Sequence, residues 1–187
     1  VLSLSLFGDA LLYVILPVHA DAFGVSMVMV GFLLAVNRII RTFAYGLIAD
    51  LAERIGIKNM CLIAAIGATL STAGYGLLEG ELLLTISRMV WGLSFAALLL
   101  VTLSYASANP LKTGTRIGLS RSVEQVGPLL AMTVGAWLAT IAGPRDVFLY
   151  LSFATAISIC LAFGLNNSGQ QKRVKRPTSR DKIFPRP

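Results

Sequence analysis

The sequence has few charged residues and a single histidine, and it lacks the closely spaced cysteines of a metal site. Charged residues make up 13% of its 187 residues, about half the usual share in a soluble domain, whereas 56% are hydrophobic. The mean hydropathy is +0.76. A water-soluble protein of this composition could not cover its core with polar side chains, while a protein surrounded by lipid needs an apolar outer surface. The composition therefore predicts an integral membrane protein.

The scarce cysteines and histidine indicate no metal ion and no cofactor. Cys61 and Cys160 lie far apart in apolar runs, which predicts two buried free thiols. His19 stands where an apolar run ends, and no cysteine or histidine has a partner at metal-ligand spacing. The first residue is Val1 rather than methionine, so we expect the sequence to be a fragment.

Six apolar stretches are each long enough to cross a bilayer as a helix, which takes about 20 residues. They cover residues 2–20, 26–48, 60–78, 82–105, 119–141 and 147–165. Six in succession, separated by short polar or Gly/Pro-containing breaks, predict an all-α membrane protein rather than the core helices of a soluble one. The first stretch could be a signal peptide, but Asp9 interrupts it and no basic segment precedes it.

Basic residues lie on alternate sides of these stretches, which predicts the topology. The loops after the second and fourth stretches hold five of them: Arg54, Lys58, Lys112, Arg116 and Arg121. The last segment, 166–187, holds seven more, whereas the other loops hold only Arg145 beside four acids. Because cytoplasmic loops carry the excess of lysine and arginine, we expect a multi-pass plasma (cell inner) membrane protein with both termini cytoplasmic. We expect a bundle over 1–165 and a disordered basic tail over 166–187.

Ionisable side chains inside the apolar stretches indicate a functional site. A charge at the bilayer centre costs about 2.5–3.5 kcal/mol, so such groups should face the bundle interior, a water-filled cavity or one another. From the helix rise, Asp9 lies roughly 15 Å and Arg88 roughly 10 Å from the outer ends of their spans, so they could pair. The predicted substrate or proton pathway comprises Asp9, Asn37, Arg38, Arg88 and Glu124. The alternative is that these groups form structural ion pairs that fix helix packing.

Three sequence elements occur in the order found in one transporter family. The segment from Gly46 to Lys58 resembles the Gly-x-x-x-Asp-Arg-x-Gly-Arg-Arg signature of the major facilitator superfamily. In the fourth stretch Arg88 and Gly92 resemble an Arg-x-x-x-Gly element, and in the fifth Gly127-Pro128 resembles the core of the antiporter signature. The first signature implies an inner gate loop at Gly46, Asp50, Arg54, Gly56 and Lys58. The others imply a helix-packing motif at Gly92, Gly127 and Pro128.

The resemblance implies the amino-terminal half of a secondary active transporter for a small solute. It implies six transmembrane helices arranged as two three-helix inverted repeats, with the tail linking to a second six-helix half. That half would lie beyond residue 187 or in a dimer mate. The partners expected are the lipid bilayer, the solute and a coupling proton, with no nucleic acid, and the antiporter element suggests drug or metabolite efflux.

Two other function classes compete with transport. A membrane-embedded enzyme would need a nucleophile and partner, but no span contains Gly-x-Ser-x-Gly, His19 sits at a span end and no aspartate pair lies at membrane depth. We therefore expect no enzymatic activity. A non-transporting or truncated membrane scaffold is the second alternative, because one six-helix half lacks the facing wall of a cavity.

Overall fold

The computed structural model describes residues 1–108 and 110–165, and within these ranges all regular structure is helical. The α-helices are α1 (Leu2–Val18), α2 (Met27–Ile55), α3 (Ile57–Leu77), α4 (Glu81–Ala106), α5 (Thr113–Leu130), α6 (Ala136–Ala142) and α7 (Asp146–Phe163). Short 3-10 helices cover Ala20–Phe23 (η1) and Pro110–Lys112 (η2), and a π-helical turn covers Ala131–Gly135 (η3). The prediction of an all-α membrane protein is confirmed. The predicted tail, 166–187, lies outside the described residues.

Six helical segments correspond to the six apolar stretches. Helix α5, the π turn and α6 follow one another without a break, so Thr113–Ala142 is a single 30-residue segment. This segment and α2, α3, α4 and α7 are long and apolar enough to cross a membrane, while α1 is an apolar helix of 17 residues. Backbone groups in lipid can be satisfied only within their own segment, which is why these stretches form helices.

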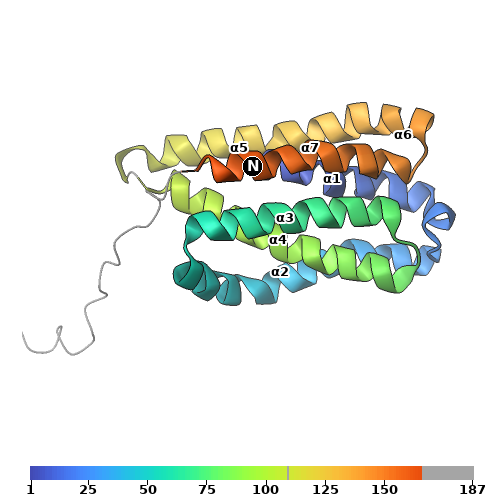
Figure 1. The fold of residues 1–187 in the computed structure, drawn as a ribbon, viewed down its shortest axis with the longest axis horizontal. Coiled ribbons are helices and arrows are strands. Elements are labelled where there is room, and N and C mark those ends of the chain that lie inside the picture. Colours follow the sequence, from blue (N-terminus) through green and yellow to red (C-terminus); the bar gives the residue numbers. More distant parts are fainter. Residues whose placement is uncertain (109, 166–187) are drawn as a thin grey trace, which may run out of the picture.

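The helices form an elongated bundle with their axes roughly parallel (Figure 1). Helices α2, α3 and α4 lie on one side, α1, α5 and α7 on the other, and the α3–α7 contact joins them. Helix α2 packs on α4, and α5 packs on α1. The second helix of each predicted three-helix unit thus packs on the first helix of the other unit, as an inverted repeat would place them. The repeat itself stays a prediction.

The predicted gate loop between the second and third stretches is largely helical, which corrects the sequence interpretation. Helix α2 continues to Ile55, so Gly46, Asp50 and Arg54 lie on it at four-residue intervals and share one exposed face. Only Gly56, with φ +89°, separates α2 from α3, and Lys58 lies in the first turn of α3. A left-handed φ suits glycine because it has no Cβ.

The interior consists of two apolar clusters with a polar layer between them. The cluster toward the α2–α3 turn includes Leu6, Ala44, Ala68 and Trp91. The cluster toward the α3–α4 turn has these members among others: Ala10, Leu33, Leu84, Phe148 and Leu151. Buried polar residues occupy the intervening positions of five helices: Asp9, Asn37, Ser71, Thr72, Ser87, Arg88, Thr155 and Ser158. Water is therefore excluded on both sides of the polar layer along the bundle axis.

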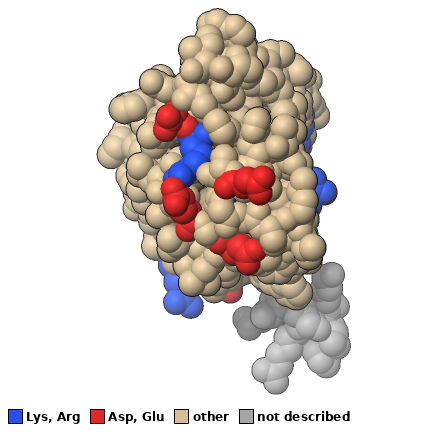
Figure 2. Space-filling model, turned by 90° about the vertical axis from the view of Figure 1, so that its right-hand side faces the viewer, with Lys and Arg blue, Asp and Glu red and all other residues tan. Residues whose placement is uncertain are grey.

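The end of the bundle that carries the α1–α2, α3–α4 and α6–α7 connections is acidic (Figure 2). Glu81, at the start of α4, accepts hydrogen bonds from the backbone N–H and hydroxyl of Ser26, at 3.3 and 2.8 Å, and thereby ties the start of α4 to the start of α2. Arg145 pairs with Glu79 and donates to the Gly76 carbonyl at 3.1 Å. These contacts tie the helix ends together across three connections.

The cysteine prediction is half right. Both thiols are free and Cys61 is buried, but Cys160 is exposed on α7. An apolar run that crosses a bilayer presents one face to lipid and another to the bundle, so hydropathy alone does not tell which face a residue occupies.

Candidate functional site

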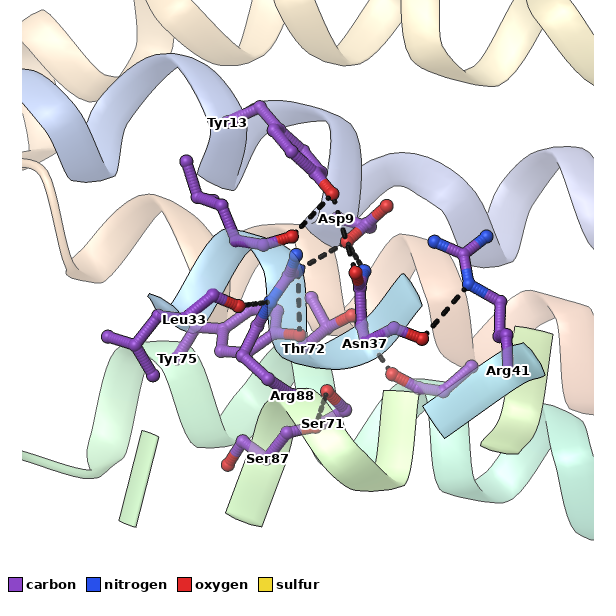
Figure 3. A network of polar contacts seen from close by, with 12 residues as sticks. Asp9, Tyr13, Leu33, Asn37, Arg41, Ser71, Thr72, Tyr75, Ser87 and Arg88 are labelled. Atoms are coloured by element: carbon purple, nitrogen blue, oxygen red, sulfur yellow. Dashed lines mark hydrogen bonds and ion pairs between the residues drawn. The ribbon is translucent and has the colours of Figure 1, made fainter. Parts of the chain in front are cut away.

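An ion pair between Asp9 on α1 and Arg88 on α4 forms the centre of the polar layer (Figure 3). The Arg88 side chain is 1% exposed and that of Asp9 11% exposed. Arg88 donates from Nη1 to Asp9 Oδ1, and from Nε to the Leu33 carbonyl at 3.0 Å. Removing one member of a buried pair is strongly destabilising, because the other charge is left uncompensated. Asp9 and Arg88, which the helix rise places at similar depths, thus hold α1, α2 and α4 together.

Asn37 and Tyr13 complete the surroundings of the Asp9 carboxylate. Asn37 Nδ2 donates to Asp9 Oδ1 at 3.3 Å, so this oxygen accepts from both Asn37 and Arg88. The Tyr13 hydroxyl donates to the Leu34 carbonyl at 3.1 Å and lies 3.5 Å from Asn37 Oδ1. Asp9 Oδ2 accepts no hydrogen bond from the described part of the chain. Among the described residues, one carboxylate oxygen is therefore held by two donors and the other by none.

Aromatic rings surround the Arg88 guanidinium. Its Cζ lies 5.2 Å from the Tyr13 ring centre and 5.9 Å from that of Tyr75, and Nη1 lies 3.5 Å from the Tyr75 hydroxyl. Such rings attract a cation through their quadrupole. Arg88 Nη2 is buried and has no hydrogen-bond partner among the described residues. This Nη2 donor is thus the one part of the guanidinium that the described side chains and carbonyls leave unsatisfied.

A polar hollow of about 460 Å³ opens beside the ion pair. Its lining residues come from α1, α2 and α4: Leu6, Asp9, Tyr13, Arg38, Arg41, Thr42, Tyr45 and Phe95. Arg38 is exposed and Arg41 is half-buried. The hollow thus brings together the Asp9 carboxylate and the guanidinium groups of Arg38 and Arg41 at membrane depth.

The structure brings some of the predicted site residues together and leaves others apart. Asp9, Asn37 and Arg88 form the buried network, and Arg38 lines the adjoining hollow. Glu124 is buried on α5, where it accepts from Arg121 Nη1 at 2.8 Å and lines a different hollow. Glu124 therefore does not join the Asp9 network.

The predicted helix-packing residues lie at close helix crossings. A Cβ built on Gly92 would stand 2.8 Å from the Asn37 carbonyl oxygen, so α4 passes directly against the α2 backbone. A Cβ on Gly127 would stand 1.8 Å from the Ser3 carbonyl oxygen. Pro128 follows within α5, three residues before the π turn.

Sequence reasoning missed the aromatic residues of the site. Tyr13 follows Asp9 by four residues on α1, and Tyr75 follows Ser71 by four on α3, so the helical repeat places each on the face of a buried polar residue. That spacing was the available signal for both tyrosines. Tyr45 follows Arg41 by the same four residues on α2, so it carried the same signal.

We expect Gly92→Ala to destabilise the protein and disturb the Asn37–Asp9 hydrogen bond. The new methyl group meets backbone atoms of Asn37, which can yield only if α2 and α4 separate. Overpacking of this kind costs about 1–3 kcal/mol. The apparent melting temperature in detergent should fall in Gly92→Ala and stay unchanged in Gly31→Ala, where nothing lies within 4 Å. Equal melting temperatures for the two variants would contradict the close crossing.

The fold and the site define a multi-pass membrane protein with a charged site at mid-depth beside a polar hollow. The sequence model of the Major Facilitator Superfamily matches residues 1–185, so the chain belongs to this family of membrane transporters. A comparison with curated proteins finds no match to the chain.

Proposed function

We propose that this protein is a secondary active transporter that couples a small solute to a proton, and that Asp9 is the proton-binding group. The observation that carries the proposal is the buried Asp9–Arg88 pair, which adjoins the polar hollow through Asp9 itself. Burying a charged pair at this depth costs free energy, so such pairs usually mark a functional site. Carboxylates so placed form proton relays in many transporters.

Protonation of Asp9 would change the balance of charge at the centre of the bundle. While Asp9 is ionised, Arg88 is compensated and α1 is tied to α4. Once Asp9 is neutral, Arg88 retains its charge in a dry layer without a counter-ion. A conformation that admits water or solute to Arg88 is then stabilised relative to the conformation in which Arg88 is buried. The proton would in this way bias the movement of this half against its partner.

A second six-helix half, in the same chain beyond residue 187 or in a dimer mate, would supply the other wall of the cavity. The exposed face of α2 supports this, because Asp50 and Arg54 are exposed on it and a Cβ on Gly46 would meet nothing within 4 Å. Glycine at an open position suits close approach by a helix from outside this bundle.

We further propose a plasma membrane location with both termini cytoplasmic and transport without covalent chemistry. The acidic end of the bundle would face outward, and the end with Arg54 and Lys58 would face the cytoplasm. The Gly127-Pro128 element supports antiport as the mode of coupling, as in drug or metabolite efflux. The rival proposal, a non-transporting scaffold, predicts no flux of any solute.

Proton movement in proteoliposomes tests the proposal. Vesicles containing the full-length protein and an internal pH-sensitive dye are challenged with a panel of anionic, cationic and neutral organic solutes. At least one solute should change the internal pH in the wild type and leave it unchanged in protein-free vesicles. Asp9→Asn should remove the pH change, because an amide cannot exchange the proton.

A counterflow experiment separates coupling from folding in Asp9→Asn. Exchange of labelled for unlabelled solute across the membrane needs no net proton movement, so it should persist in this variant. Proton movement that survives in Asp9→Asn would reject Asp9 as the coupling group. Silence of the wild type toward the whole panel would favour the scaffold.

A further inference from the structure

The hollow beside the ion pair carries an excess of positive charge. Among the described residues, the ion pairs are Arg88–Asp9, Arg121–Glu124 and Arg145–Glu79. None of them neutralises Arg38 or Arg41, and the one carboxylate in the lining, Asp9, is already compensated by Arg88. Two like charges three residues apart on one helix face repel each other, and their depth in the membrane adds to the cost.

Both uncompensated arginines lie against aromatic walls. The Arg38 Cζ lies 5.7 Å from the Tyr13 ring centre, and the Arg41 Cζ lies 4.2 Å from that of Phe95. Arg41 Nε also donates to the Asn37 carbonyl at 3.2 Å. No described residue accepts a hydrogen bond from the Arg38 side chain or from the Nη groups of Arg41. These N–H groups form the planar fork that matches a carboxylate or phosphate.

We propose that Arg38 and Arg41 bind the carboxylate or phosphate group of a small organic anion, whose apolar body packs on Phe95 and Tyr45. The inference rests on the proposed function only in treating the hollow as the transport cavity. An anion there would compensate both arginines and satisfy their free donors at once. A hollow of about 460 Å³ has room for a solute of this kind in addition to water.

The anion and the proton would use different groups of the same hollow. An ionised Asp9 repels an anion, whereas protonation removes that repulsion and leaves Arg88 uncompensated. The other charged or titratable groups around the ion pair are Tyr13 and Tyr75, whose rings lie against Arg88, and Arg38 and Arg41, which line the hollow with Asp9. Protonation therefore strengthens anion binding, which favours movement of an anion together with the proton over the antiport that the Gly127-Pro128 element suggests. A solute exchanged for the proton by antiport would instead have to compete with it.

Calorimetric titration of the full-length protein in phosphatidylcholine nanodiscs tests the anion site. The probes are benzoate, phenyl phosphate and, as a cation with the same ring, benzylamine. We expect binding of one or both anions and none of benzylamine. Arg38→Gln and Arg41→Gln should each weaken anion binding about tenfold or more, because hydrogen bonds to charged groups are the strong ones. Arg41→Lys should recover only part of the loss.

Arg116→Gln is the matched control, since Arg116 is an exposed arginine on α5 outside this hollow. It should bind the anions as the wild type does, and a cooperative melting transition in every variant should show that each is folded. Equal affinity for benzylamine, or unchanged anion binding in the double variant Arg38→Gln/Arg41→Gln, would overturn the proposal. Loss of anion binding when phosphatidylglycerol is added to the nanodiscs would assign the arginines to lipid headgroups and overturn it as well.

The two proposals fail in different ways. Anion binding without any solute-driven pH change in vesicles would leave the anion site standing and reject proton-coupled transport. Solute-driven pH change that depends on Asp9, in a protein that binds neither anion, would leave transport standing and reject the anion site.

Discussion

Arg88→Ala will reduce transport to the background of protein-free vesicles. The substitution removes the positive charge that compensates Asp9 and the hydrogen bond to the Leu33 carbonyl. Without Arg88, neutralising Asp9 no longer leaves a buried positive charge uncompensated, so proton binding can no longer favour one conformation over the other. Uptake or efflux of the solute that moves protons in the wild type, measured in proteoliposomes at equal protein content, gives the result.

Loss of transport in Arg88→Ala has a trivial explanation if the protein unfolds. Breaking a buried ion pair by removing one partner costs about 3–5 kcal/mol. The double variant Asp9→Asn/Arg88→Gln addresses this, because it removes both charges and keeps neutral hydrogen-bonding groups of similar shape. We expect it to recover most of the melting temperature lost in Arg88→Ala and none of the proton-coupled transport.

Recovery of coupled transport together with stability in the double variant would show that the pair serves packing alone. The exposed Arg116, replaced by alanine, provides the comparison for loss of an arginine as such, and it should transport at the wild-type rate. Near-normal transport in Arg88→Ala would likewise reject the role given to this side chain.

The number and position of the membrane helices could be predicted from the sequence, because bilayer thickness sets a minimum length for each apolar stretch. The end of α2 that leads into α3 could not be predicted in this way. Leu51, Ala52, Glu53 and Arg54 are all good helix formers, so the helix continues past the end of the apolar run. Hydropathy detects where lipid ends, and the helix ends only at Gly56.

The centre of the site could be predicted in part. A rise of about 1.5 Å per residue was enough to place Asp9 and Arg88 at similar depth. Depth does not tell which way a side chain points, and for that reason Glu124 was grouped with the pathway although it lies against Arg121 on another part of the bundle. The exposure of Arg38 toward the hollow depends on the rotation of α2, which packing against α4 determines.

Gly127→Ala will prevent the bundle from forming or strongly destabilise it. At this position α5 crosses α1 so closely that a Cβ would stand 1.8 Å from the Ser3 carbonyl oxygen and 2.7 Å from the carbonyl carbon. Both atoms belong to a helix backbone, so no rotamer change can relieve the clash. The Gly127 N–H also donates to Ser3 Oγ at 2.9 Å, and the lack of an N–H at Pro128 weakens the helix ladder at the same point.

Three variants on α1 and α5 separate what the close crossing and the hydrogen bond each contribute to stability. Gly127→Ala should lower stability by about 3 kcal/mol or more, at or above the usual range for overpacking, and should express poorly. Ser3→Ala removes one hydrogen bond and leaves the crossing intact, so it should cost about 1 kcal/mol. Gly118→Ala, on the same helix with nothing within 4 Å, should be neutral or slightly stabilising. Melting of purified protein measures the order, and a Gly127→Ala variant as stable as Gly118→Ala would mean that α1 and α5 do not cross at Ser3.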